Sequence, residues 1–143
     1  MTVIFSKKCE LGLQAVLFLS AQNQSMRFNA SEISKNLKVP KEFVSKVLQL
    51  LTYKGIVGSQ KGKNGGFFLA KKPEDVKLIE IVEAIDGLDM FNNCVLGFKD
   101  CGCGNPCPVH NKWGKLRDKT FKMLSEEDLG QLLKKTKNKI DSL

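Results

Sequence analysis

The chain has 143 residues and a mass of 15.9 kDa, the usual size of a single compact domain. Its composition, 42% hydrophobic and 27% charged residues, is typical of a globular protein and excludes disordered and fibrous classes. The longest uncharged segment, residues 11–26, contains six polar side chains and falls short of the about 20 apolar residues of a membrane span. No signal-peptide cleavage site follows it. We therefore expect a cytoplasmic protein that does not contact membranes.

Positive charge is concentrated in the first half of the chain. Residues 1–75 contain 12 Lys or Arg and 5 Asp or Glu, whereas residues 76–143 contain 11 and 10. No acidic residue occurs between Phe43 and Pro73. Such one-sided charge is expected of a protein that binds nucleic-acid phosphates, although a solvated lysine-rich face would have the same composition.

Apolar spacing and capping residues predict three helices in the first half. The first, over residues 8–21, is apolar on most sides. The second begins after Asn29, which caps it while Glu32 returns the capping-box bond. The third begins at Pro40 and places four apolar residues on one face: Val44, Val47, Leu48 and Leu51. Because only residues 38–39 separate the last two helices, their spacing is that of a helix-turn-helix.

Two short strands follow the third helix. Residues 56–57 and 67–69 flank the segment 61–66, in which Asn64-Gly65 is a strong signal for a hairpin turn. A helix-turn-helix followed by a hairpin with a basic tip is a winged helix. We therefore expect a winged helix-turn-helix DNA-binding domain over residues 1–75.

The second half is predicted to be helical, with one long loop. Residues 75–86 form a helix that Gly87 ends. Residues 88–110 are expected to be a loop without secondary structure, and loops of that length are usually functional. A helix over residues 111–124 has a narrow seam spaced for packing against another helix, formed by Trp113, Leu116, Thr120, Phe121 and Leu124. Ser125 and Asp128 are expected to cap a last short helix.

The long loop contains four of the five cysteines and the only histidine: Cys94, Cys101, Cys103, Cys107 and His110. In a cytoplasmic chain this clustering indicates metal or redox chemistry. Cys94, Cys101 and Cys107 suit an iron-sulfur cluster, while Cys101, Cys103, Cys107 and His110 are compact enough for one zinc ion. The metal-free alternatives are unliganded surface thiols or a redox switch of Cys101 with Cys103. Cys9, in the first helix, is expected to be a small buried residue.

The third helix and the hairpin carry the candidate DNA contacts. In helix-turn-helix proteins the second helix of the pair enters the major groove, which would place Lys41, Glu42, Ser45 and Lys46 there. Ser45 or Lys46 could read a base, and the hairpin lysines could enter the minor groove. A winged helix that binds protein instead of DNA is the alternative.

Arrangements typical of catalysis are missing from the sequence. It contains no Ser, His and Asp set, and the only histidine lies among the cysteines. The glycine-rich segment 62–66 lies in a hairpin instead of opening a helix, as a nucleotide-binding loop does. We therefore predict that the protein is not an enzyme.

Four segments resemble a known family: residues 54–59, residues 61–67, Ala84-Ile85-Asp86-Gly87 and Cys107-Pro108-Val109-His110. They are similar to those of the winged-helix transcription regulators that include IscR, NsrR, RirA and CymR. The resemblance extends from Ser6 to Leu129. It implies a mainly α-helical fold with a small β-hairpin wing and a long carboxy-terminal dimerisation helix.

The resemblance also implies partners, cofactors and site residues. Family members are homodimers that bind palindromic operators on double-stranded DNA, and many hold a [2Fe-2S] or [4Fe-4S] cluster. It implies Cys94, Cys101 and Cys107 as cluster ligands and either His110 or Glu10 as the fourth, with Glu10 supplied by the partner subunit. Lys61 replaces the arginine that is usual in the wing. The helix-turn-helix geometry, the hairpin and the resemblance together give the candidate DNA-binding residues, which are Lys41, Ser45, Lys46, Ser59, Lys61, Lys63, Asn64 and Gly66.

These observations predict a homodimeric transcription regulator whose operator affinity is controlled by an iron-sulfur cluster that senses redox state, nitric oxide or iron and cluster supply. Residues 76–143 are then a dimerisation region, with a cluster-binding loop over residues 88–110 and the long helix over residues 111–124. The alternative is a metal-free, thiol-based or zinc-stabilised regulator or scaffold of the same fold.

Overall fold

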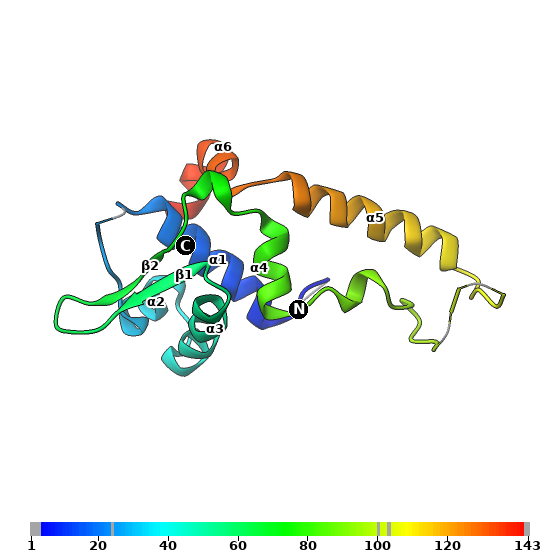
Figure 1. Ribbon diagram of the computed structural model, residues 1–143, viewed down its shortest axis with the longest axis horizontal. Helices are drawn as coiled ribbons and strands as arrows, with labels where there is room; N and C mark the ends of the chain where they lie inside the picture. The colour runs from blue at the N-terminus through cyan, green and yellow to red at the C-terminus, as the bar shows by residue number, and fades with distance from the viewer. Residues whose placement is uncertain (1–3, 24, 100, 103, 142–143) are drawn as a thin grey trace.

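The computed structural model describes residues 4–141 except residues 24, 100 and 103, and describes side chains up to residue 135. It is mainly helical with one two-stranded antiparallel sheet, so the expected fold class is confirmed. Figure 1 shows a body that contains the hairpin and most of the helices, and an arm, formed by α5 and the cysteine-containing loop, that extends away from it. Among the described residues, no helix has the length and apolar character that crossing a membrane requires.

The first three helices form where their capping residues predict. They are α1 (Lys7–Ala21), α2 (Ala30–Leu37) and α3 (Lys41–Tyr53). The Asn29 side chain accepts a hydrogen bond from the Glu32 N–H at 2.8 Å, but the Glu32 carboxylate accepts from the Asn29 side-chain amide instead of its backbone. Pro40 is the N-cap of α3 and not its first helical residue, because its backbone is still extended. Lys38, at φ 58°, makes the sharp turn between α2 and α3.

The main hydrophobic core lies where α1, α2 and α3 meet. The apolar face predicted for α3 is completely buried, and it packs against α1 and α2. Residues from all three helices and from the start of the hairpin contribute side chains to it, including Leu11, Val16, Ile33, Val44, Leu48, Leu51 and Ile56. Each large apolar side chain buried in this way contributes about 1.5–3 kcal/mol, so the helix-turn-helix is held by its own core.

The hairpin is anchored to the segment before α2. Its strands are β1 (Val57–Gln60) and β2 (Gly66–Leu69), so β1 extends three residues beyond the predicted strand. Phe28 pairs with Phe67 through two backbone hydrogen bonds of 3.1 and 2.7 Å. Gly66 lies against this pairing with φ 148°, and a Cβ atom there would come within 2.7 Å of the Phe28 backbone.

The second half differs from prediction at its element boundaries. It contains η1 (Pro73–Asp75), α4 (Leu78–Ile85), η2 (Asp89–Phe91), α5 (His110–Glu126) and α6 (Leu129–Asp141). Helix α4 starts later than predicted because residues 73–75 form a separate 3-10 turn, and Gly87 ends it with φ 76° as expected. The predicted loop is not free of secondary structure, since it begins with η2.

The last helix has a different cap from the one predicted. Ser125 lies inside α5, and Asp128 alone provides the side-chain cap, accepting a hydrogen bond from the Gln131 N–H at 2.9 Å. The helix is also longer than expected, and it packs against α1 and η1. The carboxy-terminal segment therefore returns to the winged helix. The division of the chain at residue 75 stays a prediction.

A second, smaller core joins the arm to the body. It contains Cys9 from α1, Val82 from α4, Phe91 from η2 and Leu124 from α5. The Phe91 and Phe121 rings make an edge-to-face contact with centroids 5.2 Å apart. Cys9 is fully buried, which confirms the expectation for it, and desolvation together with the Asp86 carboxylate raises the pKa of its thiol to about 12.

The contact between Gly66 and Phe28 predicts a defined stability difference. Gly66→Ala should lower the free energy of unfolding by about 2–3 kcal/mol, because it combines an unfavourable backbone conformation with a steric clash. Gly62→Ala is the matched control: Gly62 also has a positive φ, 109°, but no atom lies within 4 Å of its Cβ position. Gly62→Ala should therefore lower the free energy of unfolding by only about 1 kcal/mol. Chemical denaturation of both variants measures this, and equal losses would show that Phe28 does not restrict position 66.

Candidate functional site

Three cysteine thiols converge in the loop that forms the end of the arm; Figure 1 shows the course of this loop. Cys94 follows η2, and Cys101 and Cys107 lie further along the loop that leads to α5. The three sulfur atoms all lie within 4.8 Å of one another, and the Cys94 and Cys107 sulfurs are 3.6 Å apart. The structure thus brings together the three residues that the sequence analysis selected for a cluster.

Backbone turns and one tryptophan hold this group. Gly97, at φ 82°, donates its N–H to the Cys94 carbonyl at 3.0 Å, and the Cys107 N–H donates to the Cys101 sulfur at 3.3 Å. Trp113 donates its indole N–H to the Asn93 carbonyl at 2.9 Å. This bond ties α5 to the residue that precedes Cys94. Trp113, expected only in the helix seam, therefore also positions the cysteine loop.

The two candidates for a fourth ligand lie in different places. His110 is the first residue of α5, and its Nδ1 atom is 3.3 Å from the Cys101 sulfur. Glu10 lies in the first turn of α1, where its carboxylate is 3.6 Å from the Lys7 ammonium, and it does not join the group of thiols in its own chain. Cys103, which belongs to the predicted zinc set and to the predicted Cys101–Cys103 switch, lies outside the described residues.

Local hydrogen bonds give the thiols different acidities. Desolvation opposes ionisation of the half-buried Cys94 thiol. The backbone N–H groups of Phe98 and Leu96, with the neighbouring thiols, outweigh this and lower the pKa of Cys94 to about 7. At Cys107, desolvation and the Cys101 and Cys94 thiols raise the pKa above its ordinary value. The Cys94 thiol therefore ionises more readily than an ordinary cysteine, and the thiolate is the form that binds metal.

The residues at the site fit a thiolate-bound metal group. Two thiolates bound to one metal ion at about 2.3 Å in a tetrahedron lie about 3.8 Å apart, close to the 3.6 Å between Cys94 and Cys107. Thiolates with an imidazole are donors for zinc and for iron-sulfur clusters. Depressions of about 630 and 260 Å³ adjoin the sulfurs, so the loop also has space beside them.

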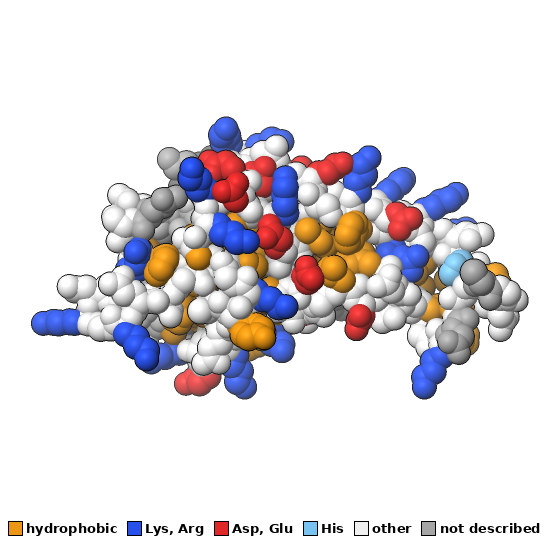
Figure 2. Space-filling view, viewed as in Figure 1, with side chains coloured by type: hydrophobic (Ala, Val, Ile, Leu, Met, Phe, Trp, Pro, Cys, Tyr) orange, Lys and Arg blue, Asp and Glu red, His pale blue; other side chains and the backbone are white. Residues whose placement is uncertain are grey.

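The candidate DNA contacts lie on α3 and around the hairpin. Lys41, Glu42 and Lys46 are exposed on α3, with Ser45 half-buried between them. The hairpin exposes Ser59, Lys61, Lys63 and Asn64, whereas Gly66 is half-buried against Phe28 for the steric reason given above. Figure 2 shows Lys and Arg side chains at the hairpin end and along the neighbouring edge of the body. These exposed residues on α3 and the hairpin make up the candidate DNA-binding surface.

Arg27 is a further cation on this surface, which the sequence analysis did not identify. Its guanidinium lies 3.8 Å from the centre of the Phe68 ring, and its Nε donates to the Gln60 side chain at 3.2 Å. Phe68 faces Gly58 across the hairpin, where a larger residue would collide with the ring. The segment before α2 pairs with the hairpin at Phe28 alone, so it lacks the alternating apolar and polar residues of a strand. The sequence therefore contains no signal that Arg27 lies beside the hairpin.

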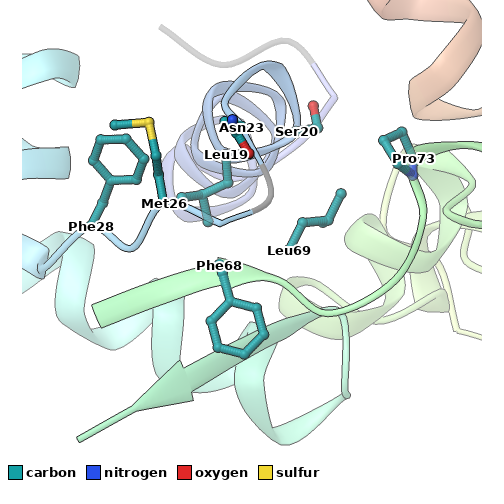
Figure 3. Close-up of a pocket in the computed structure, with 8 residues that line it drawn as sticks. All are labelled: Leu19, Ser20, Asn23, Met26, Phe28, Phe68, Leu69 and Pro73. Atoms are coloured by element: carbon teal, nitrogen blue, oxygen red, sulfur yellow. The ribbon is translucent and has the colours of Figure 1, made fainter. Parts of the chain in front are cut away.

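The described residues of the winged helix enclose a small cavity. It lies between the end of α1 and β2 and is lined by Leu19, Ser20, Asn23, Met26, Phe28, Phe68, Leu69 and Pro73 (Figure 3). Figure 3 shows Phe68 directed to the opposite side of its strand from Leu69. The cavity volume of about 10 Å³ is room for about one water molecule, so the cavity is too small for an organic ligand.

Comparisons with known proteins agree with this fold. Residues 5–135 match the Rrf2 family, described as iron-dependent transcriptional regulators. A candidate HTH-type transcriptional regulator of Aquifex aeolicus (strain VF5) is 35% identical over 132 residues, which cover 89% of this chain and 91% of that protein. The HTH-type transcriptional regulator IscR of Vibrio atlanticus (strain LGP32) is 24% identical over 129 residues, covering 90% and 74%.

Among solved structures, the fold matches that of CymR (YrzC), the global cysteine regulator of B. subtilis, with a TM-score of 0.77 at 18% identity. The match covers 94% of this chain and 99% of that one. The family match covers most of the chain, and the winged helix is the DNA-binding fold that the sequence motifs predicted. The resemblance inferred from the sequence is therefore confirmed, and this chain belongs to the Rrf2 family of transcriptional regulators.

Proposed function

We propose that this Rrf2-family regulator is a homodimer that binds a palindromic operator, and that an iron-sulfur cluster held by Cys94, Cys101 and Cys107 controls its operator affinity. The observation that carries the proposal is the convergence of the three thiols within 4.8 Å at the end of the arm. The similarity to IscR over 90% of the chain supports a cluster in preference to an unliganded thiol loop.

Exposed apolar residues on one face of α5 support the homodimer. Leu116 and Met123 are seven residues apart, which places them on the same face of the helix, and they expose 60% and 52% of their surface. Figure 2 shows an apolar patch beside α5. A helix with such a face buries it by packing against another helix, and a second copy of α5 provides one of matching shape. In the dimer, Glu10 of a second copy is a candidate fourth ligand, as is His110 of the same chain.

A cluster bound at the thiols would supply a redox-active metal centre. The chain's own residues then connect the loop to the DNA-binding unit. Cys94 lies three residues after Phe91, which is buried in the second core against α1, α4 and α5. Asp86, at the end of α4, accepts hydrogen bonds from the Ser6 backbone and side chain at the start of α1. Helix α1 packs against α3. We therefore expect the conformation of the loop to influence the position of α3, the proposed recognition helix.

Control of DNA affinity follows from the spacing of two recognition helices. In a homodimer these must lie about one turn of DNA apart, roughly 34 Å, to enter successive major grooves together. A shift of the second core changes this separation. Metal binding at the thiols changes the affinity for the operator only if the metal-bound and metal-free proteins favour different distances between the two recognition helices.

Metal analysis tests the cluster. Protein purified without oxygen should be brown, absorb visible light and contain iron and sulfide. Cys94→Ser should lose this absorption, because the cluster loses one of its three thiolates. Cys9→Ala is the matched control and should retain it, since Cys9 is buried in the second core. A colourless protein that contains no iron after reconstitution would reject the proposal.

The 3.6 Å between two of the sulfurs also favours a second candidate, a single structural zinc ion. Its ligands would be Cys94, Cys101, Cys107 and His110, whose imidazole lies beside the Cys101 sulfur. This set differs from the zinc set predicted from sequence spacing, which used Cys103. One zinc per chain and no visible absorption would identify this form.

The DNA interface predicts separate effects of base and phosphate contacts. On an operator enriched from random duplex DNA, Lys46→Ala and Lys61→Ala should each weaken binding and lower the salt dependence by about one unit of slope. Ser45→Ala should instead relax base preference at one position of each half-site. Lys134→Ala is the control, because α6 lies across the body from α3 (Figure 1). An effect of Lys134→Ala equal to that of Lys46→Ala in binding titrations would contradict this interface.

The connecting role of Phe91 is also measurable. Phe91→Leu keeps an apolar residue in the second core but removes the ring contact with Phe121. The ratio of operator affinities between metal-loaded and metal-free protein should fall by roughly 2- to 10-fold, the range expected for an aromatic pair. Visible absorption should be unchanged. An unchanged ratio would show that coupling bypasses Phe91.

A further inference from the structure

Two of the three thiols form a pair that is distinct from the third. The Cys94 and Cys107 sulfurs are 3.6 Å apart and both residues are half-buried, so solutes have access to them. The Cys101 sulfur instead accepts the Cys107 N–H and lies 3.3 Å from the His110 ring. The pairing is therefore between residues 13 positions apart and not between neighbours in sequence.

We propose that Cys94 and Cys107 form a disulfide when the metal-free protein meets a peroxide, and that this bond closes the site to metal. The inference rests on the proposed function for its consequence, the loss of metal binding, but not for the bond itself. It differs from the Cys101–Cys103 switch considered from the sequence, because the structure places the Cys94 and Cys107 sulfurs side by side.

The loop can accommodate the bond with a small movement. A disulfide has a sulfur–sulfur distance of about 2.05 Å, so the two atoms must approach by about 1.5 Å. Between the two cysteines the described side chains are exposed or half-buried, and none belongs to either core. The turn after Cys94 depends on Gly97 in the left-handed region, and Gly102 has a positive φ as well. A short displacement of this segment therefore disrupts no buried packing.

The reaction balances with hydrogen peroxide as oxidant. One thiol of the pair takes an oxygen atom from the peroxide, which gives a sulfenic acid and one water molecule. The sulfur of the second thiol then attacks the sulfenic sulfur. The sulfur–sulfur bond forms, the sulfur–oxygen bond breaks, and the hydroxyl leaves with the proton of the attacking thiol as a second water. Two thiols lose two electrons in all, and the peroxide gains them.

The disulfide would remove two of the three thiolate donors. Cys101 and His110 remain, which is too few for a tetrahedral zinc ion or for the three-thiolate cluster site. A reductant that reopens the bond restores all the donors. In the metal-free regulator, two of the metal-binding residues would therefore also react with peroxide.

Mass spectrometry of metal-free, reduced full-length protein tests the bond. One equivalent of hydrogen peroxide should lower the intact mass by about 2 Da, and non-reducing peptide mapping should find Cys94 linked to Cys107. Cys101→Ser and Cys103→Ser should still form this link, whereas Cys94→Ser and Cys107→Ser should not. A Cys101–Cys103 link, a link between two chains, or sulfinic acid without a link would overturn the proposal.

Zinc uptake measures the consequence separately. Reduced protein should bind added Zn²⁺, peroxide-treated protein should lose at least 90% of that binding, and dithiothreitol should restore it. Full zinc binding by the linked protein would overturn the closure of the site. The reduced protein could bind neither zinc nor a reconstituted cluster and still form the Cys94–Cys107 link. That result would reject the metal-dependent function and support the disulfide.

Discussion

The small core of Cys9, Val82, Phe91 and Leu124 connects the arm to the winged helix, and the proposed regulation depends on it. Each of these residues comes from a different element: α1, α4, η2 and α5. Close-packed interiors are stiff, so a displacement of one member moves the others instead of being absorbed. Phe91 has a particular position in this core, because only two residues separate it from Cys94. The thiol loop is thereby attached directly to the packing that orients α1.

Mechanical coupling matters because electrostatic coupling is weak across this molecule. Figure 1 shows the hairpin and the cysteine loop at opposite ends. In physiological salt, charge interactions are screened beyond about 8 Å, so a change in charge at the thiols does not reach the wing through solvent. In the proposed function, lysines on α3 and the hairpin attract DNA phosphates, and the thiols at the opposite end bind the metal group, with packed helices between them.

Local signals predicted much of the fold. Asn29 caps α2 and Gly87 ends α4, because each acts on backbone groups within a few residues. The predicted hairpin also formed, although its turn spans residues 61–65 and has its positive φ angles at Gly62 and Gly66 instead of at Asn64 and Gly65. The errors arose where two local signals competed. Ser125 and Asp128 are both good N-caps, and α5 continues past Ser125 because Leu124 is buried in the second core and holds that last turn in place.

The sequence by itself determined the winged helix, the basic surface and the set of thiols, because helix periodicity, turn chemistry and residue type need no knowledge of distant contacts. Only the tertiary structure decided which residues meet. It placed Cys94 beside Cys107, Arg27 over Phe68, and α6 against α1. These contacts join segments that are far apart along the chain. They form when chain entropy is offset by burial in the whole fold, and no local pattern records them.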